Sequence, residues 1–299
     1  MYFTVFTPTY NRAYILGQAY QSLLEQTCRD FLWLIMDDGS QDDTEALVQG
    51  WIRENRINIK YLKQENQGRF VAYNRAVPQA EGEIFTFLDS DDQLDPEALS
   101  ELKKIWESVE DKSKYSGILS YTKHLNGEII GNRFPEGLYA ERLYVLYDKY
   151  RLKGDKLCAF RVDLAKKYRY PEYPGEKFGG DSIVMNYINQ EAPMILCRRA
   201  LCFREYPFDS ITLNLKKHKA NSPNGQADYF RQSLELDSHQ KWRLFKHAVG
   251  YVCASRMAGR GRIIAGSPKK LLTVLAYIPG LIYLHAYFGR EYHKKCSTD

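Results

Sequence analysis

The stretch FLWLIMDDGSQDDTEALVQGWIR, residues 31–53, decides the fold class. It begins with Phe31–Met36, a continuous apolar run that is typical of a strand buried on both faces of a sheet. An acidic turn follows, and residues 43–53 then repeat apolar side chains at the spacing of a helix. A buried strand that leads directly into a helix predicts an α/β fold with a mostly parallel central sheet flanked by helices.

The same alternation of strands and helices covers the first part of the chain. Strands are expected where apolar runs recur, at Tyr2–Thr7, Ile57–Leu62 and Ile84–Leu88. Helices are expected where apolar residues repeat every three or four positions, at Ala13–Glu25, Gly68–Ala80 and Pro96–Val109. We therefore assign residues 1–113 to the first half of an α/β domain.

The pattern becomes less regular after residue 113. Short β-like runs, at Gly117–Tyr121, Cys158–Phe160 and Met194–Cys197, alternate with loops rich in Tyr, Gly and Pro. A helix with an acidic N-cap is expected at Asp181–Gln190. The sequence thus predicts a second half-domain at residues 114–226 and a basic helical region at residues 227–299.

Composition places the chain among ordinary globular proteins. Of its 299 residues, 44% are apolar and 26% are charged, which excludes disordered, collagen-like and coiled-coil proteins. The net charge of +5 is too small to indicate nucleic-acid binding. The six cysteines lack metal-ligand spacing, so reduced thiols are expected, as in a cytosolic protein. The N-terminal residues lack the features of a signal peptide, so secretion is not expected.

A first group of acidic residues directly follows the predicted strand Phe31–Met36. Asp37 and Asp38 begin a turn that continues through Gly39 and Ser40. The ligand crevice of an open α/β sheet lies at the carboxyl ends of its strands, so these carboxylates are candidate ligand-binding groups. A turn followed by a helix N-cap is the alternative interpretation, and it needs no ligand.

A second group, Asp89, Asp91 and Asp92 around Ser90, follows the predicted strand Ile84–Leu88. Carboxylates this close in sequence repel each other unless a cation or hydrogen-bond donors offset their charge. Binding of Mg²⁺ or Mn²⁺, shared with substrate phosphates, is therefore the functional interpretation. The alternative is an acidic helix N-terminus that the helix dipole stabilises.

A third acidic residue, Asp181, follows Gly179 and Gly180 at the start of a predicted helix. The two glycines allow a close approach of the backbone, which would leave the carboxylate of Asp181 facing a cleft. N-capping of the helix alone is the alternative.

Together these motifs resemble the inverting glycosyltransferases of family 2, which have the GT-A fold. The matching segments are Phe3–Arg12, Asp37–Ser40, Asn66–Gly68 with Ala72 and Asn74, and Leu88–Asp92. Beyond these the resemblance is reduced to Gly180-Asp181 and to Arg204 with Asp209–Thr212. The resemblance implies a Rossmann-like nucleotide-binding sheet, a nucleotide-diphosphate-sugar donor, commonly a UDP-sugar, and a divalent metal that bridges its phosphates.

The resemblance also implies which residues bind the donor. They are Thr7, Pro8, Tyr10, Arg12, Asp37, Asp38, Arg69, Asn74, Asp89 and Ser90. The first three would line the nucleotide base, and Asp37 or Asp38 would accept a hydrogen bond from it. Arg69 would reach the base or the ribose, and Asp89 would bind the ribose or the donor sugar.

The metal, Mn²⁺ or Mg²⁺, would be held by Asp91, with Asp92 as the competing choice. His218 is the candidate for a further ligand. A histidine that lies among lysines, as His218 does, is also typical of a solvated basic loop.

Asp181 matches the position of the general base, which removes the proton of the acceptor hydroxyl during inversion. The chain departs from the family pattern in two places. Many relatives carry Glu where this chain has Gly180, and they often carry Arg where it has Tyr73. The base is therefore assigned to a single carboxylate.

The basic C-terminal region contains an apolar segment, Leu271–Phe288, with Pro279-Gly280 near its centre. The segment is close to the lower limit for a membrane-spanning helix, but Pro-Gly is expected to divide it into two short helices. With the cations of residues 262–295, this pattern favours helices in the interface of an anionic membrane. A helical hairpin packed on the catalytic domain is the alternative.

The sequence therefore predicts an inverting, metal-dependent glycosyltransferase at the cytoplasmic face of the plasma membrane. Its expected acceptor is a glycan or a lipid-linked oligosaccharide of surface polysaccharide synthesis. A nucleotide-sugar-forming nucleotidyltransferase is one alternative, but it would need a glycine-rich phosphate loop, and residues 7–12 contain no glycine. A non-catalytic, membrane-associated binding module is the other.

Overall fold

The computed structural model describes residues 1–180, 182–205, 215–236 and 240–296, and side chains as far as residue 289. The chain separates into two compact units. The first contains Met1–Arg169 and Val184–Phe208, and the second contains Tyr170–Ile183 and Asp209–Asp299. The predicted boundaries at residues 113 and 226 concern the functional parts of the chain, and they remain predictions.

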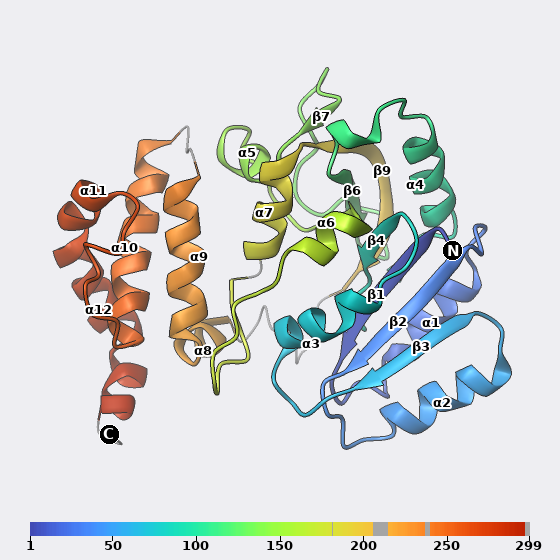
Figure 1. Ribbon diagram of the computed structural model, residues 1–299, viewed down its shortest axis with the longest axis horizontal. Helices are drawn as coiled ribbons and strands as arrows, with labels where there is room; N and C mark the ends of the chain where they lie inside the picture. The colour runs from blue at the N-terminus through green and yellow to red at the C-terminus, as the bar shows by residue number, and fades with distance from the viewer. Residues whose placement is uncertain (181, 206–214, 237–239, 297–299) are drawn as a thin grey trace. The chain divides into compact units, whose positions relative to one another are not determined.

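The first unit is built on a mixed sheet of nine strands within the described residues (Figure 1). The strand order is β3-β2-β1-β4-β8-β6-β9-β5, and β7 pairs with β9. The bounds are β1 (Phe3–Thr9), β2 (Phe31–Asp37), β3 (Asn58–Lys63), β4 (Ile84–Phe87), β5 (Asp92–Leu94), β6 (Gly117–Lys123), β7 (Ala140–Glu141), β8 (Lys156–Arg161) and β9 (Met194–Arg204).

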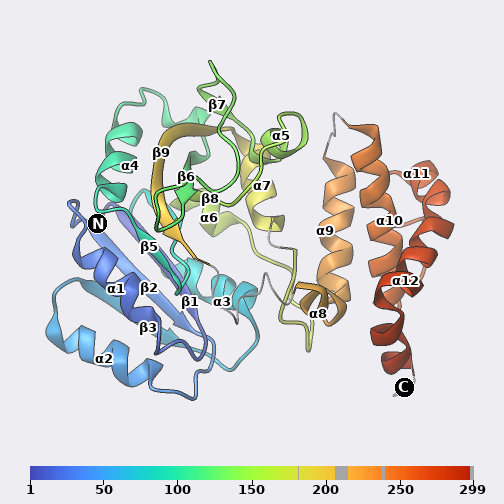
Figure 2. The same cartoon turned by 180° about the vertical axis from the view of Figure 1, so that it is seen from behind.

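The direction of pairing changes across this sheet. Strands β1 to β4 pair in parallel, as predicted. From β4 onward, parallel pairing occurs only between β6 and β9, while β8, β5 and β7 pair antiparallel to their neighbours. The register between β6 and β9 shifts at Tyr121, and Figure 2 shows β9 curving over its partners there. Such bulges bend a strand and increase its twist.

Helices cover both faces of the sheet. They are α1 (Leu16–Leu24), α2 (Thr44–Glu54), α3 (Arg69–Ala76), α4 (Ala98–Glu107), α5 (Leu143–Asp148), α6 (Val162–Lys167) and α7 (Ile183–Glu191), with short 3-10 turns at Val77–Gln79 and Lys112–Lys114. These positions confirm the helices and strands expected from the sequence, with ends that differ by a few residues, except that β9 continues to Arg204 rather than ending at Cys197. Strands β5 and β7 and helices α5 and α6 are not expected from the sequence pattern. The α/β class is confirmed.

Large aromatic side chains fill the core on the two faces. On one face Trp33 of β2 stacks with Tyr20 of α1 and Trp51 of α2, at ring-centroid distances of 6.0 and 5.7 Å. On the other, Phe6 of β1 packs against Tyr73 of α3 at 6.1 Å. Because both faces are buried there, a central strand such as β2 is apolar at nearly every position, which explains its continuous run in the sequence, whereas β3 at the end of the strand order is only partly buried.

The second unit is helical within the described residues. It contains α8 (Leu215–Ala220), α9 (Pro223–Glu235), α10 (Lys241–Met257), α11 (Lys270–Leu275) and α12 (Tyr277–Cys296). In the part of the chain that the structure describes, none of the helices has the length and apolar character needed to span a membrane.

The expected break at Pro279-Gly280 is wrong. The break lies at Ala276, between α11 and α12, and Pro279 occupies the first turn of α12. A proline is tolerated there because the amide groups of the first turn have no partner within the helix. The amide of Gly280 donates to the carbonyl oxygen of Ala276 at 2.8 Å, so the helix continues past the proline.

At Gly280, α12 packs closely against α10. A Cβ atom at this position would lie 2.6 Å from Cβ of Val252. We expect Gly280→Val to lower the free energy of unfolding of the second unit by about 2 kcal/mol, the usual cost of overpacking. Gly289→Val is the matched control, because a Cβ there would meet nothing within 4 Å. Thermal denaturation followed by circular dichroism would measure both, and equal midpoints would contradict the close approach.

Candidate active site

The site lies where β1, β2 and β4 end side by side. Thr9 is paired with Asp37 in the sheet, and the amide of Asp38 donates to the carbonyl oxygen of Thr9 at 2.8 Å. On the other side of β1, the amide of Leu88 donates to the carbonyl oxygen of Phe6 at 2.9 Å. These bonds bring the two acidic segments that follow β2 and β4 to one edge of the sheet.

Asp37 is fully buried and holds the turn after β2. Its carboxylate accepts hydrogen bonds from the amide of Ser40 at 2.7 Å and from the hydroxyl of Tyr61 at 2.5 Å. Burial, followed by this bond to Asp37, raises the pKa of Tyr61. Tyr61 therefore stays a hydrogen-bond donor, and it fixes the position of the Asp37 carboxylate.

Asp38 holds the loop that leads into α3. Its carboxylate accepts from the side-chain amide of Gln64 at 2.7 Å and from the backbone amides of Gln67 and Gly68, each at 2.8 Å. Gly68 has a φ of 94°, which a glycine adopts without strain. By holding this loop, the carboxylate of Asp38 fixes the start of α3, whose first residue is Arg69. Hydrogen bonding of Asp37 or Asp38 to a nucleotide base stays a prediction.

The end of β1 presents one exposed ring and one buried hydroxyl. The hydroxyl of Thr7 donates to the carbonyl oxygen of Leu88 at 2.7 Å and accepts from the indole nitrogen of Trp33 at 2.9 Å. Both hydrogen bonds of the Thr7 hydroxyl are therefore made within the protein interior. Pro8 is partly buried, and Tyr10 is 44% exposed, so its ring can stack on a planar group. Contact of these three residues with a base stays a prediction.

Each carboxylate of the cluster after β4 has its own arginine. The pairs are Arg69 with Asp89 (Nη2–Oδ1, 3.1 Å), Arg12 with Asp91 (Nη1–Oδ2, 3.8 Å) and Arg204 with Asp92 (Nη2–Oδ2, 2.5 Å). The three arginines come from α3, from the turn after β1 and from the end of β9. They supply the compensating charge that a cluster of three neighbouring carboxylates requires.

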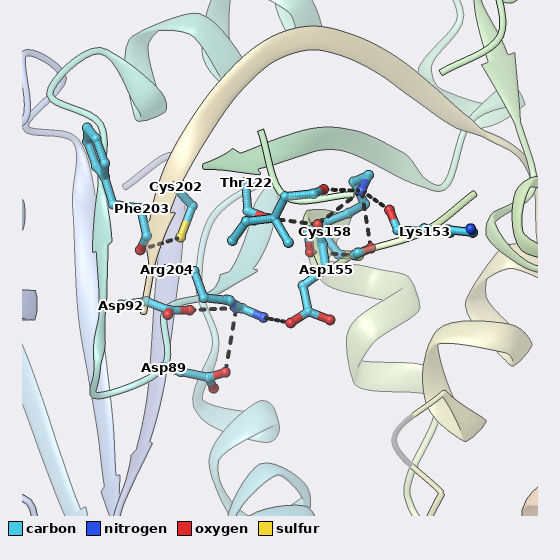
Figure 3. Close-up of polar contacts among 12 residues, drawn as sticks. Asp89, Asp92, Thr122, Lys153, Asp155, Cys158, Cys202, Phe203 and Arg204 are labelled. Atoms are coloured by element: carbon cyan, nitrogen blue, oxygen red, sulfur yellow. Dashed lines mark hydrogen bonds and ion pairs between the residues drawn. The ribbon is translucent and has the colours of Figure 1, made fainter. Parts of the chain in front are cut away.

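Arg204 is the centre of a larger ion cluster (Figure 3). It faces Asp92 directly, because β5 and β9 pair antiparallel with these two residues opposite each other. Its guanidinium also lies 3.6 Å from Asp89 and 3.2 Å from Asp155. Within the described part of the chain its Nε has no hydrogen-bond partner. Asp92 is 2% exposed, so this ion pair is an interior one.

The three carboxylates differ in how well their charge is compensated. Burial raises the pKa of Asp89, but Arg69, Arg204 and Arg12 together outweigh it and lower that pKa. Burial and the charge of Asp89 raise the pKa of Asp91. Burial also raises the pKa of Asp92, against the opposing effect of Arg204. The arginine of Asp91 is the most distant of the three, at 3.8 Å, so the Asp91 carboxylate is more accessible to an added cation than that of Asp92, which Arg204 contacts at 2.5 Å.

Removal of the Arg204 cation is expected to destabilise the first unit. In Arg204→Met, Asp92 stays buried without its closest cation, and such a loss costs about 3–5 kcal/mol. Urea denaturation should show this in the free energy of unfolding. The double variant Arg204→Met/Asp92→Asn should recover part of it, because the buried carboxylate that Arg204 contacts most closely is removed together with the cation. A single variant as stable as the parent would contradict the assignment.

The remaining predicted residues are placed less completely. Asn74 and Ser90 are buried, on α3 and after β4. Asp181 lies outside the described residues, as does Asp209–Thr212. His218 belongs to the second unit, where its ring lies 5.9 Å from the ring of Phe178. Burial, followed by the charge of Lys217, lowers the pKa of His218, so its neutral form is favoured.

The described residues contain no group of three or more His, Cys, Asp or Glu arranged to hold a metal ion. The chemistry of the donors nevertheless fits Mg²⁺ or Mn²⁺, which bind through one or two carboxylates together with substrate phosphates. Asp91, with Asp89 beside it, offers such oxygen atoms. Asp92 fits less well as a metal ligand, because its carboxylate is already paired with Arg204 at 2.5 Å.

Sequence reasoning missed two atoms of this site. Among the described residues, Oγ1 of Thr9 and Oε1 of Gln64 are buried without a hydrogen-bond partner. Both belong to residues that bond to Asp38, at the sheet edge described above. A buried acceptor or hydroxyl without a partner marks a place where a ligand can bond. Neither residue stands out in the sequence, since a Thr and a Gln at strand ends are common.

Known proteins resemble this chain in both sequence and fold. The model of the family described as Glycosyl transferase family 2 matches residues 4–169. The GalNAc(5)-diNAcBac-PP-undecaprenol beta-1,3-glucosyltransferase of Campylobacter jejuni is 28% identical over 219 residues, which are 72% of this chain and 68% of that enzyme. Two further relatives are uncharacterized glycosyltransferases of Nostoc sp. and Rickettsia felis. The matches to this chain cover 38% and 23% of the length of those two proteins.

Solved structures confirm the GT-A fold class. The S. aureus protein TarS, residues 1–349 in complex with UDP-GlcNAc, superposes with a TM-score of 0.59 at 20% identity, covering 98% of this chain and 89% of that one. The mannosyltransferase PcManGT of Pyrobaculum calidifontis, in complex with GDP-Man and Mn²⁺, has a TM-score of 0.56 at 19% identity, with coverage of 98% and 86%. At these identities the likeness shows the fold alone.

Proposed function

Since the family model matches more than half of its length, the chain belongs to glycosyl transferase family 2, and we propose that it is an inverting, metal-dependent member of that family. It transfers a sugar from a nucleotide-diphosphate donor, a UDP-sugar, to a hydroxyl group of its acceptor. The observation that carries this proposal is the meeting of Asp38 with Asp89 and Asp91, the last two each paired with an arginine, at the carboxyl edge of the parallel strands.

The nucleotide would lie along the ends of β1 and β2. Tyr10 offers an exposed ring for stacking on the base, and Oε1 of Gln64 is free to accept a hydrogen bond. Arg69 and Asp89, paired at 3.1 Å, lie where ribose or donor-sugar hydroxyls would be bound. Arg12 and Asn74 complete the predicted donor-binding set.

The diphosphate would lie beside Asp91, the proposed main ligand of Mn²⁺ or Mg²⁺. Asp92 supports this ligand through its ion pair with Arg204, and His218 stays a proposed further ligand. When bound, the metal ion offsets the negative charge on the departing diphosphate. Arg12, at 3.8 Å from Asp91, supplies a second positive charge to the same region.

Inversion requires attack from the face of the sugar opposite the phosphate. Asp181 is the proposed general base, and its carboxylate takes the proton of the acceptor hydroxyl. The acceptor oxygen forms a bond to the anomeric carbon as the bond from that carbon to the phosphate oxygen breaks, and the nucleoside diphosphate leaves. A single carboxylate is sufficient, and no covalent intermediate with the enzyme is needed.

The proposed acceptor is a glycan or a lipid-linked oligosaccharide of surface polysaccharide synthesis, used at the cytoplasmic face of the plasma membrane. The C. jejuni relative supports this class of acceptor, because its name gives an undecaprenol-diphosphate-linked oligosaccharide as its substrate. That match extends over 72% of this chain.

Slow hydrolysis of the donor tests the proposal without a known acceptor. Purified protein should hydrolyse one member of a panel of UDP-, GDP- and dTDP-sugars, and chelation of the divalent metal should stop the reaction. Adding back Mn²⁺ should restore it. If no sugar nucleotide is hydrolysed and titration calorimetry detects no binding with Mn²⁺ present, the proposal is wrong.

A further inference from the structure

The second unit contains a basic hollow that the proposed sugar transfer does not use. It is open, has a volume of about 590 Å³ and lies where α10 ends and the chain turns toward α11. Four cationic side chains line it, and no carboxylate is among its described lining residues. The cations are Arg256, Arg260, Arg262 and Lys270.

One of these cations is fixed by the fold. Arg260 donates to Oδ1 of Asp228 at 2.8 Å, to the side-chain and main-chain oxygens of Asn224 at 3.1 and 3.0 Å, and to the hydroxyl of Tyr173 at 3.2 Å. Its charge is therefore compensated by Asp228. It forms a rigid wall of the hollow.

Among the residues that the structure describes, no carboxylate compensates the other three cations. Arg256, Arg262 and Lys270 are exposed, and the described residues provide no carboxylate within ion-pair distance of them. Arg262 has a φ of 45°, a conformation that a residue with a side chain rarely adopts. Three unpaired cations around one hollow favour a ligand with several anionic oxygens.

An apolar surface begins at the edge of this hollow, at the residue after Lys270. Five large aliphatic side chains on α11 and the start of α12 are at least half exposed: Leu271 (76%), Val274 (50%), Leu275 (63%), Ile278 (69%) and Ile282 (63%). They recur every three or four residues. The opposite side of the two helices is buried, at Thr273, Ala276, Gly280, Leu284 and Phe288.

We propose that the hollow and this apolar surface together dock the protein on an anionic phospholipid bilayer, with the phosphate of one lipid headgroup held between Arg256, Arg262 and Lys270. Aliphatic side chains bordered by cations fit the boundary between headgroups and acyl chains, where apolar burial and attraction to anionic lipid act together. A contiguous apolar surface of this kind marks an interaction site rather than a requirement of folding.

This docking narrows the predicted membrane contact of residues 262–295 to a defined surface. The purpose of this docking rests on the proposed function, because an acceptor carried by a lipid would lie in the same bilayer. The docking itself needs neither donor nor metal, so the two proposals can fail separately.

Co-sedimentation of the full-length protein with vesicles tests the docking. Binding should be tight to phosphatidylglycerol-containing vesicles and weak to pure phosphatidylcholine. Arg256→Gln/Lys270→Gln should weaken binding about 25-fold, from about five-fold for each cation near an anionic surface. Lys241→Gln/Lys246→Gln is the matched control: it removes the same charge from exposed positions at the other end of α10 and should bind like the parent.

The apolar part has its own pair of variants. Leu275→Gln/Ile278→Gln should also lose vesicle binding, whereas Leu125→Gln, at an exposed leucine of the first unit, should not. All variants should keep the lipid-free donor hydrolysis of the parent, which separates loss of docking from loss of the enzyme.

Several results would overturn the docking proposal. One is equal binding of the parent to both kinds of vesicle. Another is equal loss of binding in the Arg256/Lys270 variant and in its charge-matched control. Binding of inorganic phosphate distinguishes a soluble ligand from a lipid headgroup. If millimolar inorganic phosphate binds in the hollow and the protein does not bind vesicles, the hollow is a site for free phosphate and docking on a bilayer is excluded.

Discussion

Asp91→Asn is expected to abolish metal-dependent donor turnover and to leave the fold intact. The substitution keeps the size of the side chain but removes the carboxylate that is least compensated by arginine, at 3.8 Å from Arg12. Loss of a metal that stabilises the departing diphosphate is worth several kcal/mol, so the rate should fall by at least about 10²-fold. Hydrolysis of the preferred donor across a Mn²⁺ titration would measure it.

Two further variants make this result specific. Asp111→Asn, at the exposed N-cap of the 3-10 turn Lys112–Lys114, should retain parental turnover and stability. Asp92→Asn should lose stability as well as activity, because it breaks the 2.5 Å ion pair with Arg204. Full metal-dependent turnover by Asp91→Asn would exclude this residue as the main ligand and favour Asp92.

Asp181→Ala is expected to lose sugar transfer while it retains donor binding. General-base catalysis contributes about 10²–10⁴-fold, so transfer to the acceptor hydroxyl should fall by that factor. The dissociation constant for the donor with Mn²⁺, measured by titration calorimetry, should stay within about two-fold of the parental value, because the proposed base would touch the acceptor rather than the nucleotide.

The pH dependence of the residual transfer supplies the control for this variant. In the parent, kcat should fall at low pH as the base becomes protonated, and in Asp181→Ala that fall should disappear. Transfer at the parental rate, or donor binding weakened as strongly as transfer, would assign Asp181 to a structural or donor-binding role instead.

The sequence is sufficient to predict the parallel half of the sheet. Strands such as Phe31–Asp37 are buried at every position, so their composition is restricted, and carboxylates placed directly after them must lie at the crevice edge. The acidic groups of Asp37, Asp38 and Asp89 can therefore be assigned to one site from the amino-acid sequence alone.

Pairing between distant segments cannot be predicted in the same way. Asp92 opens β5 because Arg204, 112 residues later, lies opposite it on β9. No local pattern in an acidic segment indicates a strand. Likewise, a Pro-Gly pair does not indicate that the C-terminal helices break at Ala276, nor that Gly280 packs closely against Val252 of α10.

The arginines beside Asp89, Asp91 and Asp92 also bear on the order in which ligands bind. Because these counter-ions already neutralise most of the acidic cluster, a divalent ion alone has little to gain there. The diphosphate brings the additional negative charge that favours binding of the ion. A metal ion held by Asp91, as proposed above, would therefore bind more tightly in the presence of the sugar nucleotide than alone.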